Sequence, residues 1–262
     1  MGATSLVVLK KIPDVSAAGD AAKSGEPVPW REIASYPPFR QLLIFNVAWA
    51  AAVGGLGAFT VAWLKSEALM SEAQVLLLTS AAFLGGLSSL WLLGTRLDRF
   101  GSKPVLFFAL LLWFGIAAGW MALAGGALQV QIGLVLALQF FMGLATALVN
   151  MANVRLAMAT VPVMGRSHFF ALYSVIASLT LGSAPIVWGM LIDALQPLHF
   201  DWHGFEWNRF SVFFAAVALV FLVTLTLCRR LDEPQARSME DLLYDVLEQS
   251  PLRAWFRFWA RG

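Results

Sequence analysis

Neutral polar side chains inside long apolar stretches are the residues of this chain best suited to bind a ligand. Gln139 lies in the middle of one stretch, Asn46 near the start of another and Thr180 within a third. An amide in hydrocarbon costs roughly 2–7 kcal/mol unless it is partnered, so each amide must face a cavity or a neighbouring helix. Both roles stay open for Asn46 and Gln139, and Thr180 can also bond back to its own helix. If these side chains face a cavity, Asn46, Gln139 and Thr180 line the site that binds the substrate.

No arrangement typical of catalysis accompanies these residues. We find no nucleophile–base pattern, no cluster with metal-ligand spacing and no phosphate-binding glycine loop. Cys228 is the only cysteine, which excludes an intrachain disulfide and a cysteine-based metal site. His199, Asp201 and His203 have donor atoms for a metal, but the aromatic residues among them favour an interfacial cap. The sequence therefore predicts a protein that is not an enzyme and holds no metal or cofactor.

Six apolar stretches must position the polar residues. The chain is 59% hydrophobic and only 13% charged, too few charges to cover the surface of a soluble domain. A bilayer core needs roughly 20 apolar residues in a helix, and a charge at its centre is costly. Six windows meet the length and lack Asp, Glu, Lys and Arg: 41–64, 73–94, 104–123, 130–150, 168–192 and 210–228. They predict an all-α polytopic membrane protein with six transmembrane helices.

The basic residues predict how these helices run. If the amino terminus is cytoplasmic, 16 of the 18 Lys and Arg residues lie on that side, and only Lys65 and Arg209 lie opposite. Cytoplasmic loops are enriched in Lys and Arg. We therefore expect a multi-pass protein of the cell (inner) membrane with both termini in the cytoplasm. The net charge of +2 gives no reason to expect a nucleic-acid partner.

The chain divides into three segments on this map. Residues 1–40 are rich in Ala, Gly, Ser and Pro and predict a cytoplasmic linker, residues 41–228 form the six-helix bundle, and residues 229–262 form a cytoplasmic tail. Within the tail, three arginines recur every four residues between Leu252 and Arg261, opposite aromatic side chains. This pattern is typical of an amphipathic helix that lies at the lipid headgroups. A tail without regular structure is the alternative.

Between the second and third windows lies a compact basic loop. It contains Gly94, Asp98, Arg99, Gly101 and Lys103. Glycines permit sharp turns with positive φ, and a carboxylate near the start of a helix is stabilised by the helix dipole. Such a loop can join two helix ends through charged hydrogen bonds and release them when a neighbouring bundle moves. An ordinary basic loop that only sets the topology is the alternative.

The spacing Gly-x-x-x-Asp-Arg-x-Gly-x-Lys, read from Gly94 to Lys103, resembles the signature loop of the major facilitator superfamily. The signature lies between the second and third helices of each half, where it falls here. The resemblance covers about residues 30–235 and implies a bundle of two three-helix inverted repeats, with substrate bound between two such bundles. It assigns the five loop residues to gating. The lipid bilayer, a small solute and a second bundle are the implied partners.

The chain carries six expected spans where a full member would carry twelve, and it matches a carboxy-terminal half. The favoured function is transport of a small solute by alternating access with a second six-helix bundle, either another chain or a second copy. The alternative is a non-transporting membrane scaffold or accessory subunit of a larger membrane complex. Gly182 and Pro185 are expected hinge points in the fifth window. The pattern Gly115-x-x-x-Gly119 predicts close helix packing within the bundle, with a dimer interface as the alternative.

Overall fold

The computed structural model describes residues 30–161 and 166–231 of the 262-residue chain. The side chains of Glu32 and of residues 90–100 are outside this description. Most of the expected linker and the whole amphipathic segment Leu252–Arg261 also lie outside the described residues. Helices make up nearly all of the described part, which confirms the all-α fold class.

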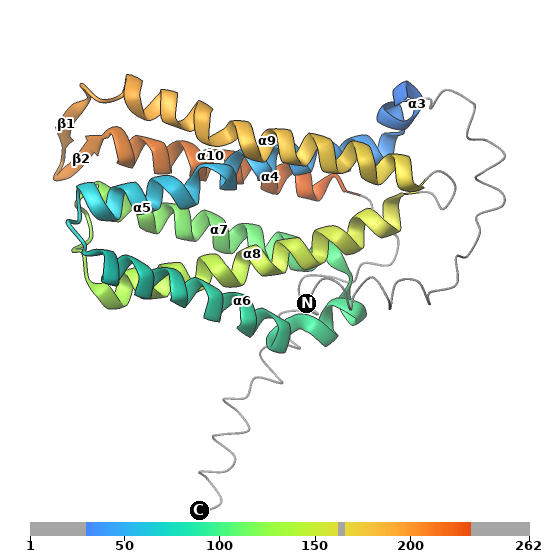
Figure 1. Cartoon of the computed structure of the whole chain (residues 1–262), viewed down its shortest axis with the longest axis horizontal. Helices are drawn as coiled ribbons and strands as arrows, with labels where there is room; N and C mark the ends of the chain where they lie inside the picture. Colours follow the sequence, from blue (N-terminus) through green and yellow to red (C-terminus); the bar gives the residue numbers. More distant parts are fainter. Residues whose placement is uncertain (1–29, 162–165, 232–262) are drawn as a thin grey trace, which may run out of the picture.

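The helices run side by side, with one β-hairpin at an end of the bundle (Figure 1). We call this end the hairpin end. The elements in chain order are α3 (Trp30–Ser35), α4 (Pro37–Gly54), α5 (Leu56–Ser66), α6 (Glu72–Phe100), α7 (Ser102–Ala124), α8 (Ile132–Thr160), α9 (Arg166–Ala194), β1 (His199–Trp202), β2 (Phe205–Asn208) and α10 (Arg209–Arg229). The short α3 and the start of α4 fall within the last residues of the expected linker.

Five helical stretches of the described residues are long and apolar enough to cross a membrane: α4 with α5, α7, α8, α9 and α10. The remaining expected span coincides with α6, whose later side chains are among those outside the description. The first expected span, 41–64, is one apolar stretch but two helices, since α4 ends at Gly54 and α5 begins at Leu56. The chain is therefore a multi-pass membrane protein.

The helices pack in the spatial order α6, α8, α7, α10, α4 and α9. In consequence α6 and α9 form the two edges of the arrangement (Figure 1). Aromatic side chains fill the middle, where the rings of Trp113 and Phe221 stack with centroids 5.2 Å apart. Trp120 and Phe214 stack in the same way at 5.9 Å. Stacked rings of this kind fix α7 against α10 more precisely than aliphatic contact alone.

Backbones come closest between α6 and α8. A Cβ atom on Gly85 would lie 1.8 Å from the carbonyl oxygen of Phe140. A Cβ atom on Gly143 would lie 1.7 Å from the carbonyl oxygen of Ala82. Real Cβ atoms do not approach another backbone this closely, so only glycine allows the two helices to lie at this distance.

Gly115 and Gly119, the pair expected to allow close packing, have different surroundings in the structure. A Cβ on Gly119 would lie 2.9 Å from Leu138 Cδ2, so this glycine does make room for α8. A Cβ on Gly115 would meet nothing within 4 Å. The prediction of close packing is confirmed at Gly119 and was wrong at Gly115, because the two positions face different surroundings on α7.

The expected loop 94–104 is largely helical. Helix α6 continues through Gly94 to Phe100, and α7 begins at Ser102. The turn is made at Gly101, whose φ of +89° suits glycine. The expectation of a turn at Gly101 is confirmed, whereas the expected turn at Gly94 was wrong, because the helix extends past it.

Candidate functional site

An open cavity of about 620 Å³ lies between α5, α6 and α8. Its walls carry aliphatic, aromatic, hydroxyl and amide side chains, and none of the described lining residues is ionisable. These are Gly57, Thr79, Ala82, Phe83, Gly86, Leu87, Gln139, Met142, Gly143, Thr146, Ala147 and Asn150. The volume falls in the range of sites for small organic ligands, which are mostly apolar with a few polar groups.

Gln139 is the buried polar group of this cavity. The residue is 7% exposed, and within the described residues its amide makes no hydrogen bond. The hydroxyls of Thr79 and Thr146 instead donate to carbonyl oxygens of their own helices, at 2.9 and 2.7 Å. The amide lines the open cavity, where water or a ligand can meet it. Of the three expected cavity residues, Gln139 is thus the one whose amide faces the cavity without a hydrogen bond to the described residues.

Asn46 has a different environment. It forms a buried network with Asn153 and Tyr173 that joins α4, α8 and α9. The Asn46 Nδ2 atom donates to Asn153 Oδ1 at 3.2 Å and to the Leu42 carbonyl at 2.9 Å. Asn153 Nδ2 donates to Asn46 Oδ1 and to the Tyr173 hydroxyl, which in turn donates to Asn46 Oδ1 at 2.9 Å. Both amides are thus satisfied by protein, as expected of a structural contact.

Thr180 lies on α9 and donates to the Ile176 carbonyl at 2.8 Å, one turn back on the same helix. Neither Thr180 nor Asn46 lines the 620 Å³ cavity. The structure therefore separates the three residues that the sequence grouped into one cavity and leaves only Gln139 there. Each of the other two has found a hydrogen-bond partner within the protein.

Tyr173 completes the buried network, and the sequence analysis did not identify it. A tyrosine in an apolar window is equally well explained by the packing of its ring. Asn153 follows Gln139 on α8, but nothing in the sequence pairs it with Asn46 or with Tyr173. Only the packing of α4 against α8 and α9 brings the three side chains together.

The break between α4 and α5 lies beside the proline of α9. Gly54 ends α4 and packs against α9, where an added Cβ would lie 2.6 Å from Ala184 Cβ, next to Pro185. Proline inside a helix removes a backbone hydrogen bond, and glycine at a helix end lowers the cost of bending. The expected hinge residue Pro185 therefore lies beside the break between α4 and α5. The other expected hinge residue, Gly182, is in open space, since a Cβ there would meet nothing within 4 Å.

Basic side chains close helix ends at the end of the bundle opposite the hairpin. Lys103 Nζ donates to the Arg229 carbonyl at 3.0 Å, at the C-terminus of α10. Arg166 donates to the Met158 carbonyl at 3.2 Å, near the C-terminus of α8. Cations at these positions satisfy terminal carbonyls and interact well with the helix dipole.

The structure describes part of the expected gating loop. Gly94 is within α6, Gly101 makes the turn, and Lys103 links the start of α7 to the end of α10. The side chains of Asp98 and Arg99 lie outside the described part of the chain. Lys103 therefore gives this loop a contact between two helix ends.

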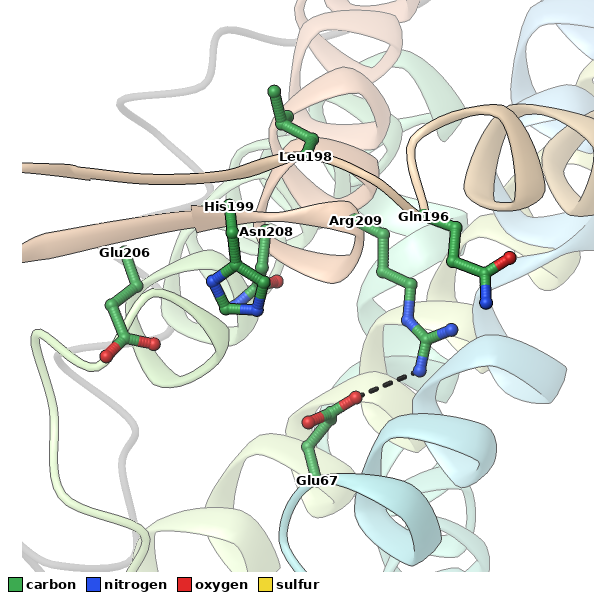
Figure 2. Close-up of a pocket in the computed structure, with 7 residues that line it drawn as sticks. All are labelled: Glu67, Gln196, Leu198, His199, Glu206, Asn208 and Arg209. Atoms are coloured by element: carbon green, nitrogen blue, oxygen red, sulfur yellow. Dashed lines mark hydrogen bonds and ion pairs between the residues drawn. The ribbon is translucent and has the colours of Figure 1, made fainter.

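A second, polar hollow of about 300 Å³ lies at the hairpin end. Its lining residues are Glu67, Gln196, Leu198, His199, Glu206, Asn208 and Arg209 (Figure 2). Arg209 Nη2, at the start of α10, donates to Glu67 Oε1 at 3.0 Å, beyond the end of α5. Lys65 forms a similar ion pair with Glu72 at 3.1 Å. Both pairs are partly exposed, so each contributes little to stability.

The hairpin separates polar from aromatic side chains. His199 pairs with Asn208 and Asp201 with Glu206, so these four share one face, and the intervening aromatic residues share the other. The turn residues His203 and Gly204 have φ of 53° and 78°, as a two-residue type I′ turn requires. Within the described residues no group of three His, Cys, Asp or Glu side chains is arranged to hold a metal ion.

Comparison with protein families gives one match. A family model described as Major Facilitator Superfamily matches residues 42–262 of the chain. The matched region includes the cavity, the buried network, the hairpin and the expected gating residues. None of the curated proteins compared with the chain matches it.

Proposed function

Because the chain belongs to the major facilitator superfamily and is a transporter of that type, we propose that it carries a small solute by alternating access, together with a second six-helix bundle. The observation that carries the proposal is the 620 Å³ cavity with the buried amide of Gln139. A purely structural bundle gains nothing from a hollow of this size, because interiors are normally close-packed.

The edges of the arrangement support a second bundle. Helix α9 has large apolar side chains that are more than half exposed, among them Leu179, Ile186 and Met190. On helix α6, the side chains of Leu76 and Phe83 are also more than half exposed, and Phe83 lines the cavity. Lipid can cover such faces, but two exposed edges beside an open cavity also suit a partner bundle that closes over it. A separate chain and a second copy of this chain both provide one.

Two sets of residues are proposed to serve the motion. Gly182 and Pro185 act as hinge positions in α9, because Pro185 lies beside the break between α4 and α5. The segment from Gly94 to Lys103 acts as the gating element, since it includes the turn at Gly101 and the contact from Lys103 to α10.

We propose that the hairpin end faces away from the cytoplasm and that both termini are cytoplasmic in the cell (inner) membrane. The support is the distribution of basic residues, since among those that the structure describes only Lys65 and Arg209 lie toward the hairpin end. The thiol of a Gln196→Cys variant should then react with a membrane-impermeant maleimide added outside sealed cells, whereas that of Arg230→Cys should not. The opposite labelling pattern would overturn the orientation without touching the fold.

Cysteine accessibility also tests the transport cycle without a known substrate. In a Cys228→Ser background, Thr79→Cys and Asn150→Cys place one thiol at either end of the cavity lining. Alternating access predicts that each thiol is labelled from both sides of vesicles prepared in the two orientations. A static scaffold or accessory subunit would be labelled from one side only. Gly115→Cys, on the exposed face of α7 away from the cavity, is the matched control and should resist labelling from both sides.

A further inference from the structure

We propose that the solute bound in the 620 Å³ cavity is an uncharged, mainly apolar organic molecule with a hydrogen-bonding group that meets Gln139. This inference rests on the proposed function, because it concerns the same cavity. It goes further by stating the chemical class of the ligand.

The neutral lining of the cavity disfavours charged ligands. All twelve described lining residues are uncharged. A charged ligand would lose its hydration in the cavity and find no opposite charge on these residues. Insertion costs of charged groups at the centre of a membrane helix suggest a penalty of roughly 100-fold in binding. Glu67, Glu206 and Arg209 line the other hollow, where Glu67 and Arg209 are paired with each other.

The polar groups of the cavity define the rest of the ligand. Thr79 and Thr146 have used their hydroxyl protons within their own helices. The amides of Gln139 and Asn150 make no hydrogen bond within the described residues. An amide offers both a donor and an acceptor, so a carbonyl, hydroxyl or N–H group can pair with Gln139. Phe83 and other apolar side chains then contact the remaining body of the ligand.

A matched pair of fluorescent probes tests the class. N-phenyl-1-naphthylamine is neutral and has one N–H group, and 8-anilinonaphthalene-1-sulfonate has the same skeleton with a negative charge. Binding of each to the purified full chain in lipid nanodiscs is measured by equilibrium dialysis, with empty nanodiscs as the blank. We expect saturable binding of the neutral probe and binding of the sulfonate at least about 30-fold weaker.

Three variants locate the binding. Gly57 lines the cavity and a Cβ there meets nothing within 4 Å, so Gly57→Leu should fill the hollow and abolish saturable binding. Gly115→Leu, equally open but on α7, is the matched control and should bind normally. Gln139→Leu should weaken binding of the neutral probe about three- to ten-fold, since one hydrogen bond is lost. If Gly57→Leu does not fold, Thr79→Phe replaces it, because Thr79 also lines the cavity and is itself exposed.

The outcomes separate the two proposals. Equal binding of both probes, each lost in the filled variant, would overturn the ligand class and leave the cavity as the site. If Gly57→Leu binds the neutral probe as well as the unsubstituted chain does, the cavity is not the binding site. Selective binding of the neutral probe together with one-sided cysteine labelling would support the class and reject transport.

Discussion

Helices α9 and α10 are neighbours in sequence and both are apolar enough to cross a membrane, but they are packed very differently. In their most apolar windows, 50% of α10 is buried and only 11% of α9. Helix α10 packs Phe214 and Phe221 against the tryptophans of α7, and both rings are fully buried. Helix α9 packs mainly on one neighbour, α4, through residues such as Ala184 and Trp188.

We infer from this difference that α10 helps to hold the bundle together, whereas α9 is free to exchange its contacts. In lipid, helices gain little from the hydrophobic effect when they associate, so packing and hydrogen bonds decide which contacts last. Stacked rings and two main neighbours fix α10, whereas α9 lies at an edge and rests on α4. We therefore expect α10 to move with the body of the bundle and α9 to move against it.

The largest effect should come from the core of α10. Phe221 contacts the rings of Trp49 and Trp113, with centroids 6.0 and 5.2 Å away. Phe221→Ala should lower the free energy of unfolding by about 3 kcal/mol through the cavity it leaves. The matched variant Leu179→Ala on α9 should change it by less than about 0.5 kcal/mol, because Leu179 is 68% exposed. Labelling of the buried thiol of Cys228 during heating in detergent measures both. Equal effects would refute the contrast.

The next effect tests the close contact between α4 and α9. Gly54→Ala would force Ala184 away, since the new Cβ would lie 2.6 Å from its Cβ. Overpacking of this kind costs about 1–3 kcal/mol. Gly182→Ala is the control on α9, and it should be neutral or slightly stabilising because its Cβ meets nothing within 4 Å. The same thiol-labelling assay applies. A Gly54→Ala variant as stable as the control would mean that this contact does not hold α9.

The hydrogen-bond network should have a smaller effect. Tyr173→Phe removes the donor to Asn46 and the acceptor for Asn153. We expect a loss of about 0.6–1.7 kcal/mol, the range of hydrogen bonds between membrane helices. A double-mutant cycle with Asn46→Ala in the thermal assay should show coupling, and the same cycle with Thr180→Val should show none. Additive effects of Tyr173→Phe and Asn46→Ala would show that the network does not anchor α9.

The smallest effect should come from the ion pair that links α10 to the end of α5. Glu67→Gln removes the carboxylate that Arg209 contacts at 3.0 Å, and both side chains are partly exposed. We expect a change below about 1 kcal/mol that disappears in high salt. Glu72→Gln, at the other ion pair, is the control. A large effect that persists in high salt would show that α10 depends on its polar end as much as on its buried rings.

Local sequence patterns predicted the positions of the helices more accurately than their contacts. The lengths and neutrality of the apolar windows placed the helices to within a few residues at most ends, because a charge in hydrocarbon is costly wherever it lies. The same patterns missed the helical continuation through Gly94. Glycine has low helix propensity, but packing decides whether a particular glycine ends a helix.

The residues of the candidate site were harder to predict from sequence than the helices were, because their surroundings are set by tertiary structure. Gln139 and Asn46 are both amides in apolar windows, and their sequence environments do not distinguish them. Asn46 meets Asn153 and Tyr173, from two other helices, whereas Gln139 lines a cavity between α5, α6 and α8. The two differ because only the packing of distant helices determines whether a buried amide meets a protein partner or faces a cavity.

The amino-acid sequence by itself determined that this chain crosses a membrane and belongs with the transporters whose signature it carries, since apolar length, charge placement and loop spacing are properties of the chain. Which faces are buried, which glycines touch another backbone and which amide faces a cavity were decided by tertiary structure. The physical reason is that every side of a membrane helix is apolar, so hydrophobicity cannot tell a protein neighbour from lipid, and close packing must.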